Sequence, residues 1–360
     1  MKIPERLKEG EIDAKGVIEE LLARIPAIEV DHIEHEHPIS SNRRVDLYVR
    51  LHVFGHPHAL VIEVKRSGQP RFARMAALQL RDYLANFGAE ATPVFIAPYV
   101  SEASRRVCDE YGIGFIDLIG NAHLQFGSVY IDRTVAEKPE SERRFLRSLF
   151  SPRASRILRV MLRDPQRKWR VTELAEAASV SLGHASNVRK ALINRGWAGE
   201  FPGGAALTDP NSLLDTWREN YSRLPGQRTA FYTHLHGEVL EHAIQSALNT
   251  EYHGGKAMLG SFSAARWLAP YGRTSTHYFY ADELGAERLQ RALQLSSVQK
   301  GTNIIIHVMK DDAVFLDAIK PAPNIVCTSK VQTYLDLSTA GDRGREAADY
   351  LRKELLQWPQ

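Results

Sequence analysis

Cysteine is scarce in this sequence, and long apolar runs are missing. The 360 residues include only Cys108 and Cys327, which excludes a disulfide framework and a cysteine cluster able to hold zinc. No stretch approaches eighteen consecutive apolar residues, and the opening MKIPERLKEGEID lacks the apolar segment of a signal peptide. We therefore expect a cytoplasmic protein without a membrane partner.

Several common catalytic signatures are also missing from the sequence. It contains no G-x-S-x-G, no P-loop and no Rossmann glycine pattern, which argues against an α/β-hydrolase and against the usual nucleotide-binding loops. Hydrophobic residues make up 44% and charged residues 25% of the chain, and these are ordinary globular values. A chain of this length therefore favours two or three domains.

Positive charge is concentrated in one part of the chain. Residues 1–150 hold 20 Lys or Arg against 22 Asp or Glu, and residues 226–360 hold 14 of each, whereas residues 151–225 hold 12 against 7. A local excess of this kind suits a module that binds a polyanion, because Lys and Arg gain affinity by releasing phosphate counterions. A solvated basic face without a partner is the alternative.

Apolar periodicity predicts a mixed-sheet α/β domain at 1–136, a charged linker at 137–150, a helical domain at 151–225 and a second α/β domain at 226–360. In the first domain we expect helices at 12–25, 74–87 and 101–111 and strands at 45–53, 59–64, 93–97 and 114–118. In the helical domain we expect helices at 153–162, 171–178 and 182–195, followed by a small hairpin at 197–208.

The stretch VTELAEAASVSLGHASNVRKALINRGW predicts a helix-turn-helix. Apolar residues at helical spacing would bury one face of each helix, and the glycine-rich stretch that follows has the length of a wing. Ser181 would cap the second helix and belong to the DNA-binding set. The open face of that helix would meet base edges with Gly183, His184, Ser186, Asn187 and Lys190, and Arg189 and Arg195 would meet phosphates. A helical hairpin with polar outer residues is the alternative.

Acidic residues within two apolar strands predict a metal site in the first domain. Asp46 stands in RRVDLYVRL, and Glu63 and Lys65 stand in LVIEVKRSG. Residues i and i+2 of a strand share a face, so Glu63 and Lys65 point together, and a neighbouring strand can bring Asp46 beside them. Two carboxylates suit Mg²⁺ or Mn²⁺, and Lys65 could stabilise charge on a scissile phosphate. Glu20, on the first helix, is a candidate outer member.

Together with Gln79 and Tyr83, one turn apart on the next helix, these residues resemble the PD-(D/E)xK nuclease superfamily, in the branch with a Q-x-x-x-Y helix. The resemblance covers roughly residues 10–100 and implies a restriction-endonuclease-like mixed sheet. It implies catalytic roles for Glu20, Asp46, Glu63, Lys65, Gln79 and Tyr83, with Asp46 and Glu63 as metal ligands. A scaffold that keeps this fold without its chemistry is the alternative.

A second resemblance covers most of the chain through diffuse motifs. GIGFIDLIGNAHL, LLDTWRENY, GGKAMLGSFSAARWL and YLDLSTAGDRGREAADYL look like AbiEi-type antitoxins of type IV toxin–antitoxin systems. This implies a transcriptional regulator with a winged helix-turn-helix, a cognate toxin or defence partner, and a C-terminal nucleotidyltransferase-like α/β domain. Gly260 and Ser261 fit that chemistry, but Asp282 and Glu283 are adjacent rather than alternating, so they would not share a metal.

Two functions remain open at this point. One is a Mg²⁺-dependent DNA nuclease targeted by its own winged helix-turn-helix. The other is a non-enzymatic DNA-binding repressor or antitoxin. In either case we expect DNA as a partner, a homodimer and a non-catalytic C-terminal domain.

Overall fold

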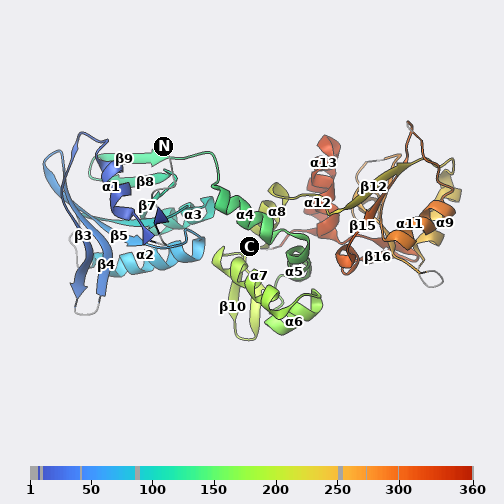
Figure 1. The fold of residues 1–360 in the computed structure, drawn as a ribbon, viewed down its shortest axis with the longest axis horizontal. Helices are drawn as coiled ribbons and strands as arrows, with labels where there is room; N and C mark the ends of the chain where they lie inside the picture. Colours follow the sequence, from blue (N-terminus) through green and yellow to red (C-terminus); the bar gives the residue numbers. More distant parts are fainter. Residues whose placement is uncertain are drawn as a thin grey trace. The chain divides into compact units, whose positions relative to one another are not determined.

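The computed structural model describes residues 7–8, 11–40, 43–85, 90–249, 254–272, 274–298 and 300–358. The chain divides into two compact units, Met1–Phe145 with Leu192–Gly196 and Leu146–Ala191 with Trp197–Gln360. Each unit mixes helices and strands, as Figure 1 shows by colour along the sequence. No helix in the described ranges is long and apolar enough to cross a membrane.

A seven-stranded sheet forms the centre of the first unit, with the strands in sequence order. Its middle strands β5, β6 and β7 are parallel, and the outer pairs are antiparallel. The expected mixed sheet is therefore confirmed. The strands are β3 (Ile28–Ser40), β4 (Arg43–Val53), β5 (His56–Val64), β6 (Ala91–Ala97), β7 (Gly114–Asp117), β8 (Ala122–Phe126) and β9 (Val129–Arg133), beside a short pair, β1 (Leu7–Lys8) and β2 (Glu11–Ile12).

Helices cover both faces of this sheet (Figure 1). α1 (Ala14–Leu22) packs Val17, Ile18 and Leu22 into one core with alternate residues of β4 and β5. α2 (Pro70–Leu84) and α3 (Glu102–Tyr111) pack into a second core that contains the remaining inward residues of those strands. The two faces of β5 are thus buried under different helices.

The helix expected at 74–87 begins earlier, at Pro70, because proline suits the first turn of a helix. Its expected positions 86–87 lie outside the described residues. Ser101 caps α3 as expected, since its hydroxyl accepts a hydrogen bond from Ser104 N–H at 3.3 Å. The segment expected as a linker carries the helix α4 (Glu140–Leu149).

Three helices and a hairpin follow, all within the second unit except the last residues of α7, which belong to the first unit. The helices are α5 (Pro152–Arg163), α6 (Val171–Ala177) and α7 (Leu182–Asn194), and the hairpin pairs β10 (Ala198–Phe201) with β11 (Gly204–Leu207). Trp169 bridges to Ala205 and so joins the hairpin. Gly204 has φ +142°, and a Cβ there would lie 2.4 Å from the Trp169 backbone, so this position requires glycine.

A six-stranded sheet, in the order β12-β15-β14-β13-β17-β16, forms the rest of the unit. Its apolar core lies under α9 and α11, and a smaller core contains Met258, Tyr280 and Val314. The strands are β12 (Gly226–Phe231), β13 (Ala257–Leu259), β14 (His277–Ala281), β15 (Ile304–Met309), β16 (Ile319–Ala322) and β17 (Ile325–Cys327). The helices are α8 (Pro210–Glu219), α9 (Gly237–Leu248), α10 (Ser261–Leu268), α11 (Glu283–Ala292), the 3₁₀ turn η2 (Asp312–Phe315), α12 (Lys330–Ser338) and α13 (Gly341–Leu355).

Candidate metal centre and nucleic-acid interface

Asp46 and Glu63 lie side by side on neighbouring antiparallel strands. The register pairs Leu47 with Ile62 and Tyr48 with Val61, so one step further along it sets Asp46 opposite Glu63, on the face that α2 covers. The Val64 N–H donates a hydrogen bond of 2.7 Å to Asp46 Oδ2. This contact holds the Asp46 carboxylate in place next to Glu63.

Glu63 is almost fully enclosed, with 2% of its surface exposed. The pKa of its carboxyl group is raised to about 7, because burial and the nearby Asp46 raise it more than a hydrogen bond and the charge of Lys65 lower it. The Lys65 ammonium donates that hydrogen bond to Glu63 Oε2. The buried Glu63 thus pairs with Lys65 and lies beside the half-buried Asp46.

Gln79 and Tyr83 reach the same site from α2. Burial raises the pKa of the Tyr83 hydroxyl, and the charges of Glu63 and Asp46 raise it further, whereas a hydrogen bond from Gln79 lowers it. The Tyr83 hydroxyl therefore lies close enough to both carboxylates for their charges to affect its pKa. The Gln79 Oε1 atom is buried and has no hydrogen-bond partner among the described residues. The structure therefore brings Asp46, Glu63, Lys65, Gln79 and Tyr83 together.

Glu20 does not lie on this face of the sheet. It belongs to α1, which packs against the opposite face, and its carboxylate pairs with Arg24 at 2.6 Å. We expected Glu20 as an outer member of the site, but the helix that carries it packs against the face of the sheet opposite the one that α2 covers. The apolar stripe of α1 fixes this placement, because burying Val17, Ile18 and Leu22 turns the helix toward the other core.

Oxygen atoms of this cluster fit Mg²⁺ or Mn²⁺. Among the described residues no group of three or more His, Cys, Asp or Glu lies together in a way that could hold a metal ion. Mg²⁺ takes hard oxygen ligands and keeps several waters, and one or two carboxylates are enough for it. The raised pKa of Glu63 indicates that the site lacks positive charge. The unbonded Gln79 oxygen indicates that it lacks a hydrogen-bond donor. A metal ion with its bound waters would supply both.

The exposed face of α7 carries the residues expected to contact DNA. Ser181, Ser186, Asn187 and Lys190 are exposed, while Ala185 and Val188 are buried beneath them. Ser181 also caps the helix, because its hydroxyl accepts a hydrogen bond from His184 N–H at 3.3 Å. His184 and Arg189 are half-buried, and Arg189 pairs with Glu200 on β10 at 2.7 Å.

Arg195 is placed differently from the phosphate contact that we expected. Its side chain is 7% exposed and its guanidinium pairs with Glu142 at 2.6 Å, with Phe145 beneath it at 4.7 Å. A buried pair of this kind satisfies both charges, so Arg195 has a structural role here. Nothing in the local sequence signals this, because Glu142 lies 53 residues away.

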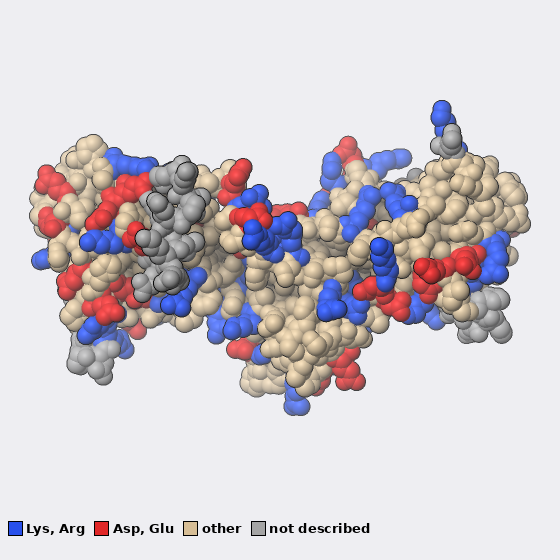
Figure 2. All heavy atoms as spheres, viewed as in Figure 1, with Lys and Arg blue, Asp and Glu red and all other residues tan. Residues whose placement is uncertain are grey.

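Sequence reasoning missed three exposed basic residues before α6. Arg167 lies 3.8 Å from the centre of the Trp169 ring, Lys168 lies 5.6 Å from that of Phe201, and Arg170 caps α6. They flank the hairpin, and their spacing in QRKWR is the signal that could have revealed them. On the face seen in Figure 2, the first unit instead shows both signs of charge interspersed.

The acidic residues near β14 have structural partners. Asp282 caps α11, since Oδ1 accepts from Gly285 N–H at 2.7 Å and Oδ2 accepts from Lys256 N–H at 2.8 Å. A carboxylate that satisfies two backbone donors is poorly placed to bind a metal. The next residue, Glu283, begins the helix.

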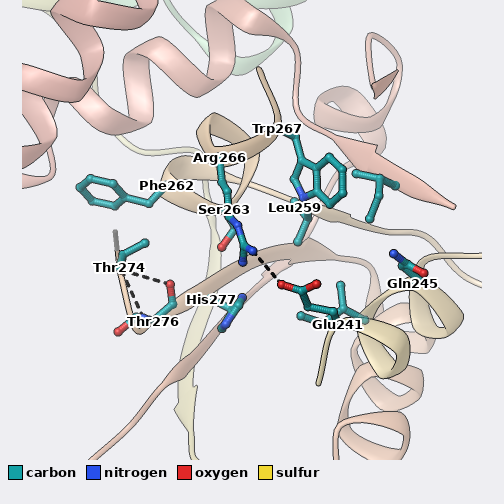
Figure 3. A pocket seen from close by; sticks show the side chains of 12 residues that line it. Glu241, Gln245, Leu259, Phe262, Ser263, Arg266, Trp267, Thr274, Thr276 and His277 are labelled. Atoms are coloured by element: carbon teal, nitrogen blue, oxygen red, sulfur yellow. Dashed lines mark hydrogen bonds and ion pairs between the residues drawn. The ribbon is translucent and has the colours of Figure 1, made fainter. Parts of the chain in front are cut away.

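A small cavity lies between α9, α10 and β14 (Figure 3). Arg266 and Glu241 form an ion pair of 2.7 Å above His277, and burial together with Arg266 lowers the pKa of His277 although Glu241 opposes this. The cavity measures about 40 Å³, which holds no more than a few waters. We assign no ligand to it.

Comparison with known proteins gives one family match. Residues 206–357 match the family model described as a transcriptional regulator, the AbiEi antitoxin of type IV toxin–antitoxin systems. This range includes the end of β11, α8 and the whole C-terminal sheet, and over it the expected resemblance is confirmed. No curated protein matches the chain.

Two solved structures are similar to part of the chain. One is a complex of EndoMS with double-stranded DNA, with 16% identity and a TM-score of 0.22, covering 32% of this chain and 47% of that one. The other is a repair endonuclease from Pyrococcus abyssi, also with 16% identity and a TM-score of 0.22, covering 31% and 49%. The chain spans about half the length of these proteins.

Proposed function

We propose that this chain is a DNA-binding protein with a Mg²⁺-dependent DNA phosphodiesterase site at Asp46, Glu63 and Lys65. The observation that carries the proposal is the juxtaposition of two carboxylates in a largely buried site with a single lysine. Burying one carboxylate beside a second, half-buried one is costly unless a further cation offsets their charge. We therefore infer that this costly arrangement serves a function and not the stability of the fold.

Each residue of the cluster has a role in this proposal. Asp46 and Glu63 would hold Mg²⁺ or Mn²⁺, which when bound acts as a Lewis acid on the phosphate and lowers the pKa of a bound water. Lys65, beside Glu63, stabilises negative charge on the phosphate or orients the attacking water. Tyr83 and Gln79 position the carboxylates from α2, and the hydrogen bond from Val64 N–H fixes the Asp46 rotamer.

The second part of the proposal is that α5, α6, α7 and the β10–β11 hairpin act as a winged helix-turn-helix. Its support is the order of elements, the exposed polar face of α7, and the basic residues Arg167, Lys168 and Arg170 beside the hairpin. In such a module, α7 enters the major groove and the hairpin contacts the backbone. The proposed nuclease would then act on DNA that this module selects.

A cleavage assay tests the nuclease. Purified full-length protein with Mg²⁺ or Mn²⁺ is incubated with plasmid and with single-stranded DNA. We expect cleavage that chelation of the metal abolishes and that Asp46→Asn and Glu63→Gln abolish. Glu110→Gln, which removes an exposed carboxylate of the same unit, is the matched control and should cut normally. If the wild type cuts neither substrate with either metal, the nuclease proposal is wrong.

A second candidate is a non-enzymatic transcriptional regulator and antitoxin. The match of residues 206–357 to the AbiEi model favours it. In this case the chain binds operator DNA through α7, a cognate toxin is its protein partner, and the first unit serves assembly. Sequence-specific DNA binding without any cleavage, together with relief of a co-expressed toxin, would support this candidate over the nuclease.

We propose that the C-terminal domain, nucleotidyltransferase-like in outline, is non-catalytic. The capping role of Asp282 supports this, because it leaves β14 without an available carboxylate pair. Incubation with labelled nucleotide should give no transfer to protein or RNA, and transfer that disappears in Asp282→Ala would contradict the proposal.

A further inference from the structure

A cavity of about 270 Å³ opens beside the C-terminal sheet, within the second unit. Its walls include Tyr278 and Tyr280 of β14, His307 of β15 and Phe262 of α10. Arg223 and Arg228, which are exposed, stand at its rim, and Asp336 of α12 lies at its base. The cavity therefore combines an aromatic wall with several charged groups.

The two arginines carry positive charge that no ion pair offsets. Across the described ranges of the chain, neither Arg223 nor Arg228 has a carboxylate within ion-pair distance. Arg223 makes only a 3.4 Å hydrogen bond to the Thr339 carbonyl. Arg228 is the register partner of His307. Burial lowers the pKa of His307, and the charges of Arg228 and Arg223 lower it further, although a hydrogen bond with the Gly226 backbone opposes them. The imidazole thus experiences a positive field.

The carboxylate at the base is already satisfied. Asp336 Oδ1 accepts hydrogen bonds from the Tyr221 hydroxyl at 2.7 Å, the Tyr280 hydroxyl at 3.0 Å and the Gln332 amide at 2.9 Å. Burial raises the pKa of Asp336 to about 6, against those three hydrogen bonds and the charge of Arg223. The lining therefore contains one carboxylate and two arginines. The aromatic hydroxyls at the base are neutral at pH 7. The cavity as a whole is therefore positive.

We infer that this cavity binds a small phosphorylated ligand. Guanidinium groups recognise phosphate through paired, charge-assisted hydrogen bonds, and two of them at one rim suit a single phosphate group. The volume is near the lower end for small-molecule sites, which suits inorganic phosphate or a nucleoside monophosphate. The ring of Tyr278, packed 5.9 Å from Phe262, offers a flat surface for a base. The inference does not depend on the proposed nuclease.

The concave shape favours a small ligand over the DNA backbone. Tyr280 and Phe279 are buried, and Tyr280 stacks on His307 at 5.2 Å, so the recognition surface extends below the rim. A duplex would contact the rim arginines alone. Binding of a small ligand should therefore depend on the residues of the wall, whereas binding of a duplex should depend on the rim arginines alone.

Isothermal titration of the full-length protein with inorganic phosphate and, separately, with AMP tests the site. We expect saturable binding of at least one probe, weakened about tenfold or more in Arg223→Gln/Arg228→Gln, since two charge-assisted contacts are lost. Arg291→Gln, an exposed arginine on α11, is the control and should bind as the wild type does. Tighter binding of AMP than of phosphate would identify a nucleotide, and equal binding would identify phosphate alone.

A second measurement distinguishes a bound anion from a structural role of the arginines. In ¹H–¹⁵N spectra the pKa of His307 should rise when the probe is added, because a neighbouring anion stabilises the imidazolium. An absence of binding at millimolar phosphate and AMP would overturn the inference, as would equal binding by the double variant. Loss of DNA affinity in the double variant, without any binding of small phosphates, would overturn it in favour of a DNA-contacting rim.

Discussion

Glu63 is a carboxyl group held in a site where its neutral form is favoured. Its pKa is raised to about 7 in the folded chain, from an ordinary value of 4.5. Between these two values the folded chain retains a proton that the unfolded chain loses. The stability of the metal-free protein should therefore fall as the pH rises from about 4.5 to about 7, and level off above it.

Denaturant unfolding of metal-free wild type and Glu63→Gln across this range measures the effect. The variant lacks the titrating group, so its stability relative to the wild type should increase with pH and then reach a plateau. The difference between the two proteins isolates Glu63 from Asp336, whose raised pKa acts in the same direction. A difference that does not change with pH would show that Glu63 titrates normally.

Lys65 contributes charge without being a metal ligand. In Lys65→Met, cleavage should fall by about two orders of magnitude, as for other losses of a transition-state contact. Because Lys65 opposes the rise in the Glu63 pKa, Mn²⁺ affinity measured by calorimetry should weaken near pH 7, where protons compete, and return to the wild-type value near pH 9. Lys65→Arg should keep the metal affinity at both pH values. Weakened Mn²⁺ binding at pH 9 would contradict this role.

At the scale of elements, the proposed DNA interface on α7 would make two kinds of contact. In an Asp46→Asn background, Lys190→Gln should weaken binding to all sequences and reduce the salt slope by about 1, as expected for one lost phosphate contact. Asn187→Ala should instead lower sequence discrimination by about 1–3 kcal/mol at one base pair. Fluorescence anisotropy over a salt series measures both effects, and Arg291→Gln is the control. Identical salt slopes for Lys190→Gln and the background would contradict the proposal that α7 contacts DNA.

A buried arginine ties α5 to the C-terminal part of the second unit. Arg159 is 2% exposed, its Nε lies 2.9 Å from Asp317 Oδ2, and it donates a hydrogen bond of 2.8 Å to the Ala313 carbonyl. The contact with Asp317 has ion-pair distance without hydrogen-bond alignment. Arg159→Met would leave Asp317 without its cation, so unfolding should become easier by about 3–5 kcal/mol.

Urea unfolding of Arg159→Met and of Arg159→Met/Asp317→Leu checks this prediction. The double variant should regain much of the lost stability, because replacing both members of a buried pair avoids an uncompensated charge. Arg163→Met, an exposed arginine of the same helix, should change stability little. A double variant no more stable than the single one would show that the hydrogen bond to Ala313 dominates instead.

At the scale of the molecule, we expect a homodimer. Helix-turn-helix proteins commonly bind two half-sites through two-fold symmetry. Light scattering should give a mass near twice the 40.5 kDa of one chain, with or without Mg²⁺. A mass of 40.5 kDa at micromolar concentration would contradict the dimer while leaving the predictions for Glu63 and Lys65 unaffected.

Local pattern in the sequence determined much of the secondary structure. Short apolar runs on either side of a turn located β4 and β5, helical periodicity located α2, α5 and α7, and Ser101 marked the start of α3. The edge strands β3 and β9 were missed, because their residues are largely polar and exposed. An edge strand buries little, so its sequence carries a weak signal. The family match at 206–357 agrees with motifs read from the sequence.

Tertiary structure decided which of these residues meet. The i, i+2 spacing already placed Glu63 and Lys65 on one face of a strand, but only the strand register brought Asp46 opposite Glu63, and only the packing of α2 added Tyr83 and Gln79. Packing also turned α1, and with it Glu20, to the other face of the sheet, and it buried Arg195 against Glu142. Such contacts join residues far apart in sequence, and burial, which sets the pKa of Glu63, exists only after the chain has folded.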